Sequence, residues 1–204
     1  MRVIDISRPM LGAAVYPGDP SPYLERISAI DAGDDFNTGI LHASLHAGTH
    51  LDAPLHAVPD GDGVCSLSSD VFFGECTVTA FDGVMDGQQA ETLLASLGKI
   101  KRLLLRGNVT LSPFAAYVFA DAGLCLVGVE GVSVSSAPYD EQVHRILLSA
   151  GVALLEGLDL SKAEAGKYFL TAAPLCIEGA EASPVRAMLI QRQNIDWDEN
   201  TWRR

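Results

Sequence analysis

Short apolar runs separated by helix-forming segments dominate the second half of the chain. Three runs are each short enough to be a buried strand. They lie at residues 101–106, 124–129 and 152–156. Three helices are predicted beside them, at residues 86–97, 112–122 and 141–150. Alternation of strand and helix is typical of an α/β protein with parallel strands.

Capping residues mark the predicted start of each helix. Asp86 and Gln89 have the spacing of a capping box. Ser112 precedes Pro113, a pair that suits a cap and the first helical position. Asp140 is expected to cap the third helix. The sequence therefore predicts three capped helices.

The first half of the chain is mostly strand and turn. Strands are predicted at residues 3–6, 23–30, 37–44 and 74–81, and later strands at 168–173 and 185–191 complete the sheet. Turn-forming residues fill segments 11–22, 31–35 and 59–63. The predicted fold class is therefore α/β with a mixed sheet. A single domain spanning residues 1–204 is expected, because this length allows one substantial core.

Four of the five histidines fall within residues 42–56. Gly48, Thr49 and Pro54 disfavour a helix there, so we interpret the segment as extended or gently bent, with alternate side chains on opposite sides. The residues of one parity that lie close together are His46, His50, Asp52 and His56. Histidine and carboxylate are the usual ligands of zinc and related ions, which favours a metal site over solvated loop histidines. His42 has the same parity, but an ordinary strand residue is an equal interpretation.

Glu156 follows the apolar run at 152–155, at the predicted carboxyl end of a strand. Sites in α/β sheets gather at such ends. A carboxylate there is costly to bury unless it is paired or bound to a metal, although a solvated strand end is the alternative. His144, taken alone, would be interpreted as a surface or capped histidine early in its helix.

Charge and cysteine content narrow the class of protein. The formal net charge is −12, which argues against a nucleic-acid or anionic-membrane surface. The N-terminus carries charges unlike those of a signal peptide, and no run approaches eighteen apolar residues. The cysteines are scattered, at Cys65, Cys76, Cys125 and Cys176. This pattern predicts reduced, mostly buried thiols in a cytoplasmic protein, without disulfides.

The segment from His46 to His56 resembles the H-x-G-T-H-x-D-x-P-x-H signature of the cyclase family of metal hydrolases, which includes bacterial kynurenine formamidase. The resemblance covers nearly the whole chain. It continues in the aromatic-Pro-Gly-Asp loop at 16–19, the histidine and glutamate segments at 144–148 and 151–158, and the closing strand at 182–186.

The resemblance implies a site for two divalent metal ions, zinc or sometimes manganese. His46, His50 and Asp52 would hold one ion, and Asp52, His144 and Glu156 the other, with the two carboxylates shared between the ions. His56 would be the catalytic acid/base, and Tyr16 would line the substrate pocket. The family also implies a swivelling β/β/α fold and a homodimer or homotetramer.

The expected reaction is hydrolysis of an aryl formamide such as N-formylkynurenine. Metal-bound hydroxide would attack the carbonyl, and His56 would protonate the leaving amine. Two departures from the formamidase pattern leave the substrate open. Tyr16 stands where tryptophan is expected, and Glu130-Gly131 where Asp-Thr is usual; either could lie near the substrate. The alternatives are a hydrolase of cyclic amides resembling isatin hydrolase, an enzyme for another small carbonyl compound, and a metal-binding protein without turnover.

Overall fold

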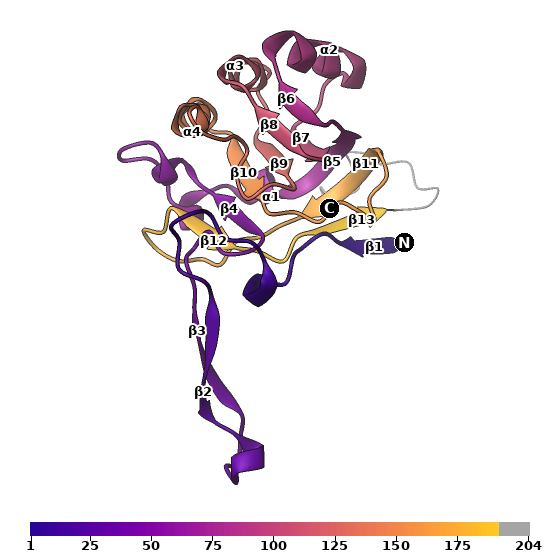
Figure 1. Cartoon of the computed structure of the whole chain (residues 1–204). Coiled ribbons are helices and arrows are strands. Elements are labelled where there is room, and N and C mark those ends of the chain that lie inside the picture. Colours follow the sequence, from indigo (N-terminus) through magenta and orange to yellow (C-terminus); the bar gives the residue numbers. More distant parts are fainter. Residues whose placement is uncertain (192–204) are drawn as a thin grey trace.

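The computed structural model describes residues 1–191, so the predictions for Trp197 and Trp202 lie outside the described residues. A nine-stranded mixed sheet has the order β1-β13-β11-β5-β7-β9-β10-β4-β12 (Figure 1). In chain order these strands are β1 Arg2–Asp5, β4 His50–Asp52, β5 Phe73–Ala80, β7 Arg102–Arg106, β9 Leu126–Val129, β10 Ala153–Glu156, β11 Gly166–Thr171, β12 Ala182–Pro184 and β13 Met188–Gln191. β5, β7, β9 and β10 run parallel, and the outer strands pair antiparallel. The mixed α/β architecture agrees with the prediction.

Three helices lie along one side of this sheet (Figure 1): α2 Gly87–Leu97, α3 Pro113–Asp121 and α4 Asp140–Ser149. Asp86 and Gln89 form the predicted capping box, and Ser112 caps α3. The predicted helix at 141–150 is present as α4, but its predicted cap is wrong, because Tyr139 is the N-cap residue and Asp140 is already helical. α1 (Ser69–Phe72) is a single turn. No described helix is long and apolar enough to cross a bilayer.

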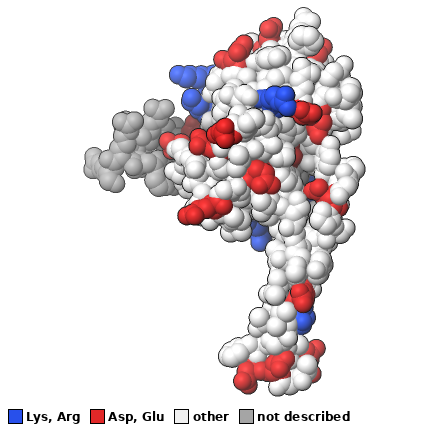
Figure 2. Space-filling view, turned by 90° about the vertical axis from the view of Figure 1, so that its left-hand side faces the viewer, with Lys and Arg blue, Asp and Glu red and all other residues white. Residues whose placement is uncertain are grey.

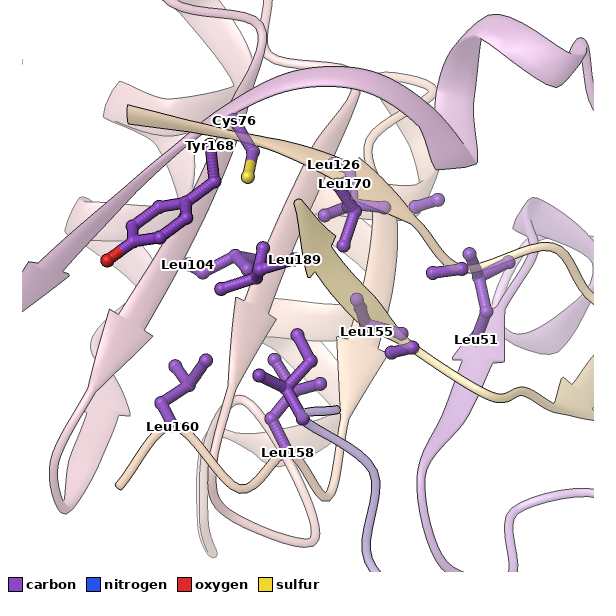
Figure 3. Close-up of a cluster of buried hydrophobic side chains, with 14 of the residues drawn as sticks. Leu51, Cys76, Leu104, Leu126, Leu155, Leu158, Leu160, Tyr168, Leu170 and Leu189 are labelled. Carbon is purple, nitrogen blue, oxygen red and sulfur yellow. The ribbon is translucent and has the colours of Figure 1, made fainter. Parts of the chain in front are cut away.

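Side chains of the central strands alternate between two cores. Leu104 packs into the cluster away from the helices, whereas Leu103 and Leu105 pack against α2 and α3. Figure 3 shows the first cluster, which includes Leu104, Leu155 and Leu189. Burial on both faces explains why these strands are uninterrupted apolar runs.

Two small sheets lie outside the main one. β2 (Tyr23–Ser28) and β3 (Thr38–His42) form a two-stranded arm that projects away from the body (Figure 1). β6 (Gly83–Met85) pairs with β8 (Val109–Leu111). Four 3-10 turns connect elements, at Met10–Gly12, Ile30–Ala32, Pro54–His56 and Val64–Ser66.

A disulfide joins Cys65 and Cys176, whose Cα atoms are 4.7 Å apart. The prediction of reduced thiols is therefore wrong for this pair, while Cys76 and Cys125 are free. The partners are separated by 111 residues, and no sequence spacing identifies such a pair. Cytoplasmic location, which depended partly on reduced thiols, stays a prediction.

Replacing both Cys65 and Cys176 with serine is expected to lower the free energy of unfolding by about 2–4 kcal/mol, because the cross-link restricts the unfolded chain. Equilibrium unfolding in denaturant measures this change. The control Cys125→Ser removes a free cysteine and should change stability by about 1 kcal/mol or less. Equal stability of the double variant and the parent would contradict the presence of a disulfide between Cys65 and Cys176.

Candidate metal centre

Two neighbouring strands and one helix bring most of the predicted ligands together. In the antiparallel pairing of β10 with β4, Glu156 lies opposite His50, and Leu154 opposite Asp52. Leu154 belongs to the core on the helix side, so Asp52 also faces the helices. His144 on α4 approaches the same point, with Nε2 3.4 Å from Oε1 of Glu156.

The turn before β4 places His46 beside them. Residues 45–49 turn more sharply than the extended or gently bent segment that was predicted, and Gly48 adopts a left-handed φ of 69°. Position 157, directly after β10, also requires glycine, because a Cβ there would lie 2.4 Å from the carbonyl oxygen of Gly48. The turn and the short strand at 50–52 together bring His46, His50 and Asp52 to one place. The sequence predicts that they meet, but through alternation along an extended segment.

All five predicted ligands converge in the structure. Nδ1 of His46 is 3.0 Å, and Nε2 of His50 is 3.6 Å, from Oδ1 of Asp52. Nε2 of His144 is 3.9 Å from Oδ2 of the same carboxylate. Glu156 Oε2 lies 3.3 Å from Nε2 of His50. Asp52 is thus at the centre of the cluster.

The carboxylate of Asp52 is what makes the cluster fit a metal. It is fully buried, and among the described residues neither of its oxygens has a hydrogen-bond partner. A buried carboxylate without hydrogen-bond donors is strongly destabilising unless positive charge lies close to it, and a bound metal ion or protonated histidines can supply that charge. Ligands bound to one zinc at about 2.1 Å are about 3.4 Å apart, close to the 3.0–3.9 Å separations around Asp52. The residues present therefore fit divalent ions.

Backbone carbonyls orient two of the histidines. Nδ1 of His50 lies 3.0 Å from the carbonyl oxygen of Gly48, and Nδ1 of His144 lies 2.9 Å from that of Asp140. A carbonyl oxygen only accepts, so in each ring Nδ1 is the donor. Nε2 of both rings then faces the carboxylates, where the neutral ring can bind a metal.

Opposite charges within the cluster shift its pKa values. Burial alone would lower the pKa of His50 and His144, but Asp52 and Glu156 raise the pKa of each to about 9. Burial would raise the pKa of Glu156, and the two histidines hold it below its usual value instead. The cluster without metal is therefore a set of paired charges.

A cavity of about 810 Å³ opens beside the cluster, and both His56 and Tyr16 line it. This volume is typical of a small-molecule site. The ring centroid of His56 lies 4.4 Å from that of His46 and 5.4 Å from that of His144. A ring nitrogen of His56 is also within 4.8 Å of ligand atoms of His46 and Asp52. The position of His56 therefore suits either an acid/base or a further ligand.

Asp140, the first residue of α4, accepts hydrogen bonds from two residues that line the cavity. The hydroxyl of Tyr16 donates to Oδ2 of Asp140 at 2.8 Å, and Ser133 donates to Oδ1 at 2.6 Å. The carboxylate of Asp140 raises the pKa of Tyr16. Phenylalanine or tryptophan at position 16 could not donate this hydrogen bond from a hydroxyl. The sequence suggested a helix cap for Asp140 and gave no signal of this contact.

Two other residues lie apart from the site. Glu130 accepts hydrogen bonds from the backbone N–H groups of Gly107 and Leu160, at 2.7 and 2.8 Å, and is not among the described residues that line the cavity. The expectation that it could lie near the substrate is therefore wrong. His42 lies on the arm, where it stacks on Tyr23. The ordinary strand interpretation of His42 is confirmed.

Comparison with known proteins identifies the family. The Cyclase family model matches residues 4–136, which include the histidine motif. The chain belongs to the cyclase family. A cyclase-family relative named kynurenine formamidase, from Salinibacter ruber, is 35% identical over 206 residues, covering 93% of this chain and 97% of that protein.

Solved structures share the fold of this cyclase-family chain. A potential metal-dependent hydrolase with cyclase activity superposes with a TM-score of 0.78 at 25% identity, covering 95% of this chain and 99% of the other. Isatin hydrolase A from Labrenzia aggregata, bound to benzyl benzoate, gives a TM-score of 0.80 at 21% identity, with 94% of each chain covered. The predicted fold class, a swivelling β/β/α architecture with a mixed sheet, is confirmed.

Proposed function

We propose that this chain is a metal-dependent hydrolase that cleaves an aryl formamide such as N-formylkynurenine into kynurenine and formate. The observation that carries the proposal is the buried carboxylate of Asp52, which accepts no hydrogen bond from the described residues and has three histidines within 3.9 Å. The relative named kynurenine formamidase, matched over 97% of its length, supports the choice of substrate. All residues from 1 to 204 are proposed to act as one hydrolase domain.

Two divalent ions, zinc or alternatively manganese, are proposed to occupy the cluster. His46, His50 and Asp52 would hold one, and Asp52, His144 and Glu156 the other. Such ions supply water activated near neutral pH and positive charge for the developing oxyanion. Nitrogen and oxygen ligands without cysteine are more typical of a catalytic site than of a closed structural one.

His56 is proposed to move the proton that the reaction requires. The nitrogen of an aryl amide leaves readily only when it is protonated. His56 lines the cavity beside His46 and His144, where it can take a proton from the attacking water and deliver it to the departing nitrogen. Its role is therefore that of a general base followed by a general acid.

Hydrolysis of a cyclic amide is the second candidate, and the likeness to isatin hydrolase A in fold is the observation that favours it. A direct comparison of kcat/KM for N-formylkynurenine and isatin, with the metal-loaded protein, separates the two. We expect N-formylkynurenine to be preferred by about 10²-fold or more. A preference for isatin would be consistent with the proposed metal site but would contradict N-formylkynurenine as the substrate.

The contact of Tyr16 with Asp140 is expected to shape the substrate pocket. Tyr16→Phe removes one hydrogen bond and should lower kcat/KM by about 2- to 10-fold, mainly through a higher KM. Steady-state kinetics measure the change, and Tyr117→Phe, at an exposed position on α3, serves as the control. Unchanged kinetics in Tyr16→Phe would contradict this role.

A second copy of the chain is proposed to cover the arm, giving a homodimer or a homotetramer built from it. A lone two-stranded ribbon is marginally stable in water. The arm and its tip nevertheless expose seven large apolar side chains: Tyr23, Leu24, Ile27, Ile30, Phe36, Ile40 and Leu41. Leu24 pairs with Leu41 on one face, and Tyr23 and Ile40 lie on the other. Figure 2 shows acidic side chains at the tip and a largely uncharged surface along the arm.

Analytical ultracentrifugation tests this interface. Leu24→Glu combined with Leu41→Glu should convert the assembly to monomers, because two charges would enter the buried patch. Phe114→Glu with Tyr117→Glu places the same charges on exposed apolar positions of α3 and should leave the assembly intact. A parent protein that is already monomeric, or an arm variant that still assembles, would overturn the proposal.

A further inference from the structure

The ring of His46 lies between two carboxylates. Its Nδ1 is 3.0 Å from Oδ1 of Asp52, and its Nε2 is 3.4 Å from Oε1 of Glu181. Asp52 is fully buried inside the cluster, whereas the side chain of Glu181 is 38% exposed. Glu181 therefore faces the side of the ring that points away from the cluster.

His46 is oriented differently from the other two histidines. His50 and His144 each direct Nδ1 to a backbone carbonyl and Nε2 to the carboxylates of the cluster. In His46 the nitrogens are reversed, because Nδ1 faces Asp52. The polar group near its outer nitrogen is the carboxylate of Glu181 rather than a backbone carbonyl.

The backbone holds Glu181 at a fixed place beside the ligands. Its carbonyl oxygen accepts from the N–H of Ala53 at 2.9 Å, and the next residue, Ala182, lies opposite Asp52 in the pairing of β12 with β4. One residue earlier, the carbonyl oxygen of Ala180 accepts from Val64 at 2.9 Å. Glu181 is therefore anchored on both sides next to the strand that carries Asp52.

We infer that Glu181 is a positioning residue for metal binding through His46. Its carboxylate accepts the proton on Nε2 of His46 and so fixes the tautomer in which Nδ1 is free to bind a metal beside Asp52. A carboxylate behind a metal-binding histidine orients the ring and makes it a stronger ligand. The inference rests on the proposed function, because it requires that the cluster binds metal.

Zinc affinity, measured by competition with a chromophoric chelator, tests this role without using activity. Glu181→Ala should weaken the binding of one of two zinc ions by about 10- to 100-fold, and Glu181→Gln, which keeps an acceptor oxygen, should weaken it less. Glu178→Gln, an exposed carboxylate in the same segment, should bind like the parent. Unchanged zinc affinity in Glu181→Ala would overturn the inference.

Histidine ¹⁵N NMR of the zinc-loaded parent provides a second test that does not depend on a variant's folding. The ring proton of His46 is expected on Nε2, whereas those of His50 and His144 are expected on Nδ1. A proton on Nδ1 of His46 would overturn the inference. A parent protein that binds no zinc would instead contradict the proposed function. The failure of the Glu181 inference and the failure of the proposed function are therefore distinguishable.

Discussion

With asparagine in place of Asp52, the protein is expected to lose both metal ions and more than about 10³-fold of its kcat/KM. Asp52 is a proposed ligand of both ions, and its carboxylate lies within 3.9 Å of three histidines. Loss of the ions removes several kcal/mol of transition-state stabilisation, and each 1.36 kcal/mol is about tenfold in rate. Metal content after dialysis and steady-state kinetics measure the two effects.

Thermal unfolding gives a further readout for this variant. Added zinc should raise the melting temperature of the parent but not that of Asp52→Asn, because only a native state that binds the ion is stabilised by it. Asp121→Asn, at an exposed position at the end of α3, should respond like the parent. Two tightly bound ions in Asp52→Asn would show that the cluster is not organised around this carboxylate.

His56→Ala is expected to keep both metal ions and to lower kcat by about 10²- to 10⁴-fold, the usual range for loss of a general acid/base. His56 lines the cavity and lies beside the cluster, and Asp52 has three other histidines close to it. Single-turnover kinetics with metal-loaded protein separate the chemical step from product release.

His42→Ala is the matched control, because this histidine lies on the arm and stacks on Tyr23. It should change neither metal content nor kcat. A ring nitrogen of His56 is within 4.8 Å of ligand atoms of His46 and Asp52. Loss of one metal ion from His56→Ala would therefore reassign this residue as a ligand.

Local chemistry made much of the fold predictable. The capping box at Asp86 and Gln89 and the Ser112-Pro113 start placed α2 and α3 correctly, because caps act over three or four residues. The run at 103–105 identified β7, since a strand buried on both faces is apolar throughout. Strands of three residues, such as β6 (Gly83–Met85), carry too little pattern to be recognised.

The candidate site was predictable in its residues but not in its geometry. The histidine motif and Glu156 named side chains that the structure brings together. Contacts made over long sequence separations gave no signal. Glu181 reaches His46 across 135 residues, and Tyr16 reaches Asp140 across 124. Such pairs depend on how β4, β10 and α4 pack, which hydrophobic periodicity does not specify.

The proposed function is tested most directly by hydrolysis of N-formylkynurenine by the protein after chelation and after reloading with zinc or manganese, with metal content measured in parallel. We expect activity in the loaded protein, loss on chelation, and recovery as the metal content rises towards two ions per chain. Turnover that persists in fully chelated protein, or no turnover of this substrate by protein that holds two ions, would contradict the proposed function.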